Sequence, residues 1–282
     1  MRYLIKNKLE FCWLLLTLVF FSFHKFTRPA NLILPVGAYL SVKDTIKGPP
    51  FQYYKGAITR GDTRKKELAL VFTGDEFAEG GKLVMEVLAA QKIKGSFFFT
   101  GKFYRNPGFT SFVKELAQAR HYLGPHSDEH LLYCDWKNRD SLLVTKEQFT
   151  KDLTRNMASM KNAGIDTSSA RYFIPPYEWY NDSIAKWTKL MNMQLINYTP
   201  GTLSAADYTY PGLPNYRTAS DIYQSIMDEE EKKKEGLNGF ILLVHIGTDE
   251  RRVDKFYNLL QQMIIELKNK GYRFKRIDEL LK

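Results

Sequence analysis

Two histidines four residues apart are the strongest chemical signal in this 282-residue sequence. His126 and His130 enclose the polar segment His-Ser-Asp-Glu-His. At this spacing, in a loop or a first helical turn, both imidazoles can face one ion, and Zn²⁺ favours imidazole nitrogen. The alternative is a pair of surface histidines in a polar turn. Because the chain has only five histidines, we predict that these two are metal ligands.

Adjacent carboxylates supply the other half of a possible metal site. Asp75 and Glu76 follow an apolar run at residues 68–72. Neighbouring like charges raise each other's pKa, and a nearby cation removes that penalty. One carboxylate can then bind the ion while the other accepts a proton, although a solvated acidic turn is the simpler explanation. The residues alone leave open which of Asp75 and Glu76 binds the ion and which accepts the proton.

A third histidine, His245, ends the apolar run at residues 240–244. It is either a satisfied core histidine or a catalytic imidazole at the carboxyl end of a strand. Aromatic residues beside two prolines, Tyr177 and Trp179, suit stacking against sugar rings, although turn packing explains them equally well.

Strand and helix patterns alternate along residues 66–282, which we interpret as one catalytic domain. Strands are expected at residues 68–72, 95–100, 122–124, 172–174, 194–198, 240–245 and 272–277. Helices are expected at residues 82–91, 109–119, 146–163, 182–191, 220–234 and 252–270, before a short terminal helix. This alternation predicts an α/β fold with a parallel sheet, and about seven strands predict a distorted (β/α)-barrel. The polar clusters follow strand ends, where such barrels carry their functional residues.

The amino terminus has the pattern of a targeting segment. Arg2, Lys6 and Lys8 precede an apolar run at residues 11–23. This length fits a signal peptide better than a full span, but no clear cleavage site follows. We therefore expect residues 1–23 to be a signal peptide or an inner-membrane anchor, so that the body is exported to the periplasm or beyond. Prolines and glycines at residues 24–65 predict an irregular connector.

Charge and cysteine content exclude some classes of protein. The formal net charge is +10, but the basic residues are scattered and no nucleic-acid motif accompanies them, so we expect no nucleic-acid partner. Only Cys12 and Cys134 occur, which excludes a disulfide framework. We expect a monomer whose membrane contact, if the segment is uncleaved, is made by residues 11–23.

The order of these motifs resembles the polysaccharide deacetylase family, the NodB-homology domain of carbohydrate esterases, over residues 66–278. The family's paired-aspartate motif corresponds to residues 73–76, its H-S/T-x-x-H motif to residues 126–130, its R-x-P-Y segment to residues 174–177 and its Leu-x-His to residues 243–245. A segment with Asp and Trp matches residues 199–207 weakly, and residues 95–101 look like the family's second strand.

The resemblance implies a metal-dependent hydrolase that removes acetyl groups from the N-acetylated sugars of an envelope or extracellular polysaccharide. It implies a divalent ion, Zn²⁺ or alternatively Co²⁺, Ni²⁺ or Mn²⁺, bound by His126, His130 and Glu76, with Asp75 as the alternative carboxylate ligand and Glu79 in reserve. It also implies Asp75 as the base and His245 as the general acid. Tyr177 would offer its backbone N–H to the oxyanion, and Trp179 and Arg171 would contact the glycan.

Two departures from the family pattern leave alternatives open. The first motif reads Asp75-Glu76 in place of Asp-Asp, and an ungapped count places Thr73 and Gly74 opposite the family's pair. Ile174 replaces the arginine that usually steadies the base, and Arg171 lies one strand-length back. The alternatives are an inactive carbohydrate-binding relic of the same fold and an esterase that acts on O-acetyl groups.

Overall fold

The computed structural model describes residues 50–282, which belong to one compact unit. The predictions for residues 1–23, and for residues 24–49 of the connector, fall outside the described residues. Among residues 50–282, no helix has the length and apolar character needed to cross a membrane.

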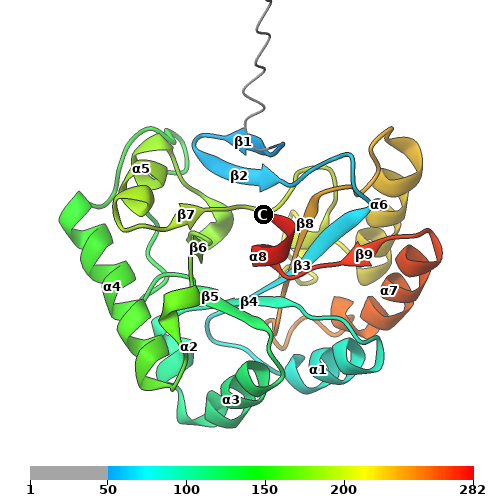
Figure 1. The fold of residues 1–282 in the computed structure, drawn as a ribbon, viewed down its shortest axis with the longest axis horizontal. Helices are drawn as coiled ribbons and strands as arrows, with labels where there is room; N and C mark the ends of the chain where they lie inside the picture. The colour runs from blue at the N-terminus through cyan, green and yellow to red at the C-terminus, as the bar shows by residue number, and fades with distance from the viewer. Residues whose placement is uncertain (1–49) are drawn as a thin grey trace, which may run out of the picture. The chain divides into compact units, whose positions relative to one another are not determined.

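The described chain alternates strands and helices in nearly the predicted order (Figure 1). The strands are β1 (Gln52–Tyr54), β2 (Ala57–Arg60), β3 (Glu67–Gly74), β4 (Ser96–Phe99), β5 (Tyr122–Pro125), β6 (Tyr172–Phe173), β7 (Gln194–Leu195), β8 (Phe240–His245) and β9 (Arg273–Phe274). The helices are α1 (Gly81–Ala90), α2 (Gly101–Arg105), α3 (Thr110–Gln118), α4 (Lys146–Asn162), α5 (Asp182–Leu190), α6 (Ala219–Lys232), α7 (Leu260–Asn269) and α8 (Ile277–Leu280).

The main sheet is parallel, which confirms the predicted α/β class. Its order is β5-β4-β3-β8, and β9 pairs with the start of β3. β6 and β7 form a second parallel pair. The segment after β7 bonds to β8 through the Thr199 amide and the Ile241 carbonyl, 3.0 Å apart. No strand ladder joins β5 to β6 within the described residues, so a closed seven-stranded barrel stays a prediction.

Alternate residues of the central strand face two different cores. On β3, Ala69 and Val71 pack with Ile241 and Leu243 of β8 in an inner cluster that also contains Ile174. The other face of β3 packs with the side chains of surrounding helices. Figure 1 shows the strands near the centre of this unit and the helices around them. The inner face therefore directs the last residues of β3 and β8 into a common space.

Part of the segment predicted as a connector is folded. β1 and β2 form an antiparallel hairpin, and all four residues of β2 are buried. The Thr199 hydroxyl donates a hydrogen bond to the Thr59 carbonyl, 2.5 Å away. Turn-forming prolines and glycines on either side of a four-residue strand made this hairpin resemble a connector.

One helix start also differs from the prediction. The helix expected from residue 252 begins at Leu260, after a 3₁₀ turn. Arg252 is fully buried in the preceding loop, where its guanidinium donates a hydrogen bond to the Arg217 carbonyl. α5 begins at Asp182, as predicted, and the Asn181 side chain caps it by accepting a hydrogen bond from the Ile184 amide.

Candidate functional site

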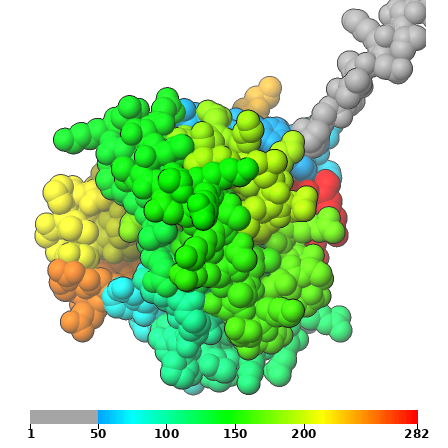
Figure 2. Space-filling view, turned by 90° about the vertical axis from the view of Figure 1, so that its left-hand side faces the viewer, coloured from blue at the N-terminus to red at the C-terminus, as the bar shows by residue number. Residues whose placement is uncertain are grey.

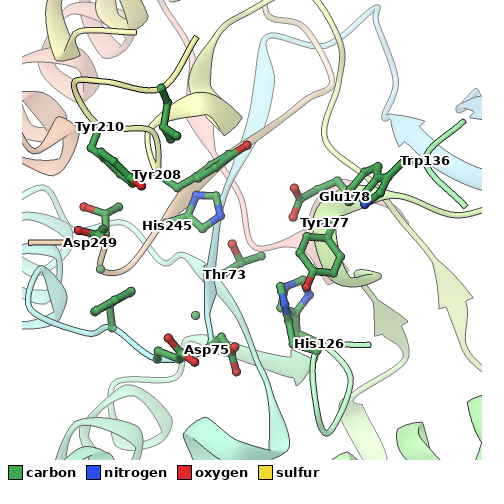
Figure 3. Close-up of a pocket in the computed structure, with 17 residues that line it drawn as sticks. Thr73, Asp75, His126, Trp136, Tyr177, Glu178, Tyr208, Tyr210, His245 and Asp249 are labelled. Atoms are coloured by element: carbon green, nitrogen blue, oxygen red, sulfur yellow. The ribbon is translucent and has the colours of Figure 1, made fainter. Parts of the chain in front are cut away.

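The six residues expected to converge line one pocket of about 540 Å³ (Figure 3). They are Asp75, Glu76, His126, His130, Tyr177 and His245. Asp75 and Glu76 follow β3, the two neighbouring histidines follow β5, and His245 ends β8. The pocket therefore lies at the carboxyl ends of the parallel strands, as the barrel pattern predicted.

The other two predicted contact residues lie away from this pocket. Trp179 packs beside the pocket residue Trp136, with their ring centroids 5.5 Å apart. Its indole nitrogen donates to the Asp135 carbonyl. Arg171 is exposed just before β6 and is absent from the pocket lining. Ile174 fills the inner core three residues further on, so the pocket gains no arginine from this segment.

Helix α4 holds the loop that carries the two histidines. The Asp152 carboxylate accepts hydrogen bonds from the Ser127 and Tyr133 hydroxyls and from the backbone amides of Asp128 and Glu129. The Asn156 side-chain oxygen accepts a hydrogen bond from the His126 amide, 2.7 Å away. Figure 2 shows the side of the molecule that α4 covers. These bonds fix the loop from behind and leave its histidines facing the pocket.

Both loop histidines are neutral near pH 7. Burial lowers the pKa of His126 well below its usual value, and the nearby His130 adds to this effect. Burial also lowers the pKa of His130 to about 4, although the Asp75 charge opposes the shift. His126 Nδ1 lies 2.9 Å from the Ile174 carbonyl oxygen, to which it donates as the Nδ1–H tautomer. Its Nε2 is then an acceptor, as a metal ligand or hydrogen-bond acceptor must be.

A third metal ligand is not in place. Residues 50–282 contain no group of three His, Cys, Asp or Glu side chains arranged to hold a metal ion. Catalytic zinc sites use three protein ligands. Glu76 is exposed at the pocket rim, and both Asp75 oxygens accept hydrogen bonds, from Thr100 at 2.8 Å and from Lys102 at 3.1 Å. The residues present in this part of the chain do not fit a three-ligand catalytic ion.

The residues at the end of β3 explain why a third metal ligand is missing. Thr73 and Gly74 are its last residues, and Thr73 pairs in register with His245. The Thr73 hydroxyl is buried without a hydrogen-bond partner in the described structure, and its side chain lines the pocket. A Cβ on Gly74 would lie 2.8 Å from Ile246 and 3.0 Å from Phe99. Gly74 thus has no room for a ligating side chain.

His245 forms a dyad with a residue that sequence reasoning missed. Its Nδ1 lies 2.6 Å from Asp207 Oδ1, and its amide donates to Oδ2 of the same carboxylate. Burial lowers the pKa of His245, but the Asp207 and Glu178 carboxylates together outweigh burial, and the net pKa is raised. Nε2 of this imidazole is therefore suited to give up a proton. Asp207 lies in residues 199–207, which weakly match the family's segment with Asp and Trp. This weak match was the sequence signal that could have identified Asp207.

Glu178 is the second residue that the sequence analysis missed. Tyr177 and Glu178 both have positive φ values, 58° and 52°. This turn directs the Glu178 carboxylate into the pocket between His245 and Tyr177 (Figure 3). Burial raises the pKa of Glu178 to about 7, against the opposing effect of His245. No pattern in the sequence separates Glu178 from an ordinary polar turn residue.

Comparisons with known proteins agree with this architecture. Residues 60–196 match the polysaccharide deacetylase family model. The chain is 25% identical over 224 residues to the peptidoglycan-N-acetylmuramic acid deacetylase of Bacillus subtilis, covering 78% of this chain and 73% of the relative. It is 26% identical over 203 residues to a Bacillus cereus peptidoglycan-N-acetylglucosamine deacetylase, covering 71% and 80%.

A solved structure supports the fold. A pseudoenzyme of carbohydrate esterase family 4 from Bacillus anthracis superposes with a TM-score of 0.64 at 21% identity, over 82% of this chain and 70% of that one. The match of residues 60–196 to the family model and the similarity to the two peptidoglycan deacetylases support the polysaccharide deacetylase family for this chain, and the shared fold agrees with it.

Proposed function

We propose that this chain is a hydrolase that removes acetyl groups from the N-acetylated sugars of a cell-envelope polysaccharide outside the cytoplasm. The observation that carries the proposal is the His245–Asp207 dyad, which faces His126 and His130 across a pocket with aromatic walls. The names of the two curated relatives support peptidoglycan as the polysaccharide.

The dyad suits the departure of an amine from an acetamide. Asp207 holds His245 by Nδ1 and stabilises its protonated form, so that Nε2 can protonate the leaving nitrogen. We keep Tyr177 as the proposed oxyanion contact, because it lies beside His130 with ring centroids 4.5 Å apart. Asp75 stays the proposed base, at the rim of the same pocket.

A second candidate function is glycan binding with little or no turnover. The specific observation that favours it is the end of β3, where Thr73 and Gly74 supply no carboxylate and Gly74 has no room for one. The description of the Bacillus anthracis neighbour as a pseudoenzyme supports the idea that this fold exists without activity.

One experiment separates these functions. The chain is incubated with N-acetylated and with O-acetylated glycans, with and without a chelator, and released acetate is measured. Our proposal expects acetate from the N-acetylated glycan. Acetate only from the O-acetylated glycan would favour an esterase. Glycan binding without any acetate would favour the binding protein. The chelator samples report whether an ion held by fewer protein ligands takes part.

A further inference from the structure

The pocket contains a carboxylate, that of Glu178, which no lysine or arginine of the described chain neutralises, and its neighbour His245 is already paired with Asp207. Within the described residues, the Glu178 carboxylate makes no hydrogen bond. Only the backbone of Glu178 does: its amide donates to the Pro175 carbonyl, and its carbonyl accepts a hydrogen bond from Asn197 Nδ2, 2.9 Å away. No lysine or arginine lines the pocket in this part of the chain. A half-buried carboxylate without a partner is costly and invites a cationic ligand.

Apart from Glu76, which is exposed at the rim, the other carboxylates of the pocket already have partners. Asp75 pairs with Lys102, Asp207 with His245 and Asp249 with Arg251. The carboxyl group of Glu178, whose pKa burial raises to about 7, therefore has no paired cation among the described residues of the pocket, although the whole chain carries a formal charge of +10.

The walls of the pocket suit a sugar ring. Trp136, Tyr177, Tyr208 and Tyr210 line it, and the first three are about half exposed. Such rings stack on the apolar faces of sugars, and their π-systems attract cations within about 6 Å. The Thr73 hydroxyl, only 1% exposed and without a partner in the described structure, faces the same space. It is a second polar group that a ligand would satisfy.

We propose that this pocket preferentially binds a sugar with a free ammonium group, a deacetylated amino-sugar unit of a glycan, with the ammonium on Glu178 and a sugar hydroxyl on Thr73. The inference rests on the proposed function, because an amino sugar is the product of that reaction. It goes further, because it makes the product a better ligand than the acetylated substrate. An acetamide is neutral and leaves the buried carboxylate without a counter-charge, whereas an ammonium forms a charge-assisted hydrogen bond.

Calorimetric titration of the full chain tests this inference. The probes are β-1,4-linked glucosamine and N-acetylglucosamine oligosaccharides of equal length. We expect the glucosamine oligosaccharide to bind about tenfold more tightly, since hydrogen bonds to charged groups contribute about 1.5 kcal/mol or more. Glu178→Gln should abolish this preference, and Glu178→Gly should do the same if the amide variant folds poorly. Glu147→Gln, which removes an exposed charge outside the pocket, should leave the preference intact.

Equal or tighter binding of the acetylated oligosaccharide by the unmodified chain would overturn the inference, as would a preference that survives both Glu178 variants. Acetate release is measured in the same samples. Release without a preference for the amine contradicts this inference alone. A preference for the amine without release contradicts the proposed hydrolysis alone.

Discussion

Three pocket residues have backbones in the left-handed region, where non-glycine residues are disfavoured. These are His130, Tyr177 and Glu178, with φ values of 57°, 58° and 52°. Such a conformation costs on the order of 1 kcal/mol for a residue with a Cβ, whereas glycine adopts it freely. Strain of this kind persists where the surrounding structure enforces it, and it clusters at functional sites.

Glu178→Gly should therefore stabilise the fold while removing the proposed amine contact. Relief of the positive φ and of the half-buried charge should raise the free energy of unfolding by about 1 kcal/mol. Urea denaturation measures this change. Glu178→Ala, which keeps the Cβ, is the control and should give a smaller gain. A lower stability of the glycine variant would show that the Glu178 side chain supports the fold.

Thr73→Asp should create the missing third ligand. Its carboxylate would join two neutral imidazoles, and an ion that binds only the folded state raises the melting temperature. We expect added Zn²⁺ to raise the melting temperature of Thr73→Asp by several degrees more than that of the unmodified chain. Thr73→Asn, which has the same shape without the charge, is the control. An equal Zn²⁺ shift in the unmodified chain would mean that its metal site is already complete.

At the level of elements, α4 carries more of the site than its sequence suggests. Asp152 accepts four hydrogen bonds from the histidine loop and its surroundings. Asp152→Ala would leave buried donors unpaired and should lower the free energy of unfolding by about 3 kcal/mol or more. Glu147→Ala, at an exposed position of the same helix, should change it by about 0.5 kcal/mol at most. A small effect of Asp152→Ala in urea denaturation would show that the loop is fixed by other contacts.

The sequence predicted the elements best where their periodicity was strong. The buried runs of β3 and β8 and the amphipathic pattern of α4 were located within two residues. The hairpin of β1 and β2 was missed because its strands are three and four residues long. Arg252 was placed in a helix because its buried bonds to distant carbonyls leave no local signal.

The candidate site was predictable only in part, for a related reason. Residues at strand ends, such as His126 and His245, were found because parallel strands bring their carboxyl ends together. Asp207 and Glu178 reach the pocket through irregular turns, whose paths depend on tertiary packing and positive φ values. The lack of room for a side chain at Gly74 is visible only once its neighbours Ile246 and Phe99 are known.

The whole molecule should lose stability in mild acid. Burial lowers the pKa values of His121 and His130 to about 4, so these groups stay neutral in the folded state while the unfolded chain takes up protons near pH 6.5. The free energy of unfolding is highest above about pH 6.5 and falls as the pH is lowered toward 4. Each of the two histidines accounts for up to about 3 kcal/mol of this decrease.

His121 offers a clean test of this acid sensitivity. Its Nδ1 accepts the Gly95 amide at 3.0 Å, which requires a neutral ring. His121→Asn keeps an acceptor near this position without a titrating group. Urea denaturation between pH 7 and pH 4 should show a smaller loss of stability for this variant. Identical pH profiles for the variant and the unmodified chain would show that His121 does not contribute to the acid sensitivity.

The rate of acetate release from an N-acetylated peptidoglycan oligosaccharide, compared between the unmodified chain and His245→Gln, tests the central claim most directly. Loss of a general acid should lower the rate by a factor of at least about 100. Glycan binding, measured in parallel, should change little because Asp207, Glu178 and the aromatic walls remain. The account predicts acetate release that depends on His245. It would be contradicted by an unchanged rate in His245→Gln, or by an unmodified chain that binds the oligosaccharide and releases no acetate.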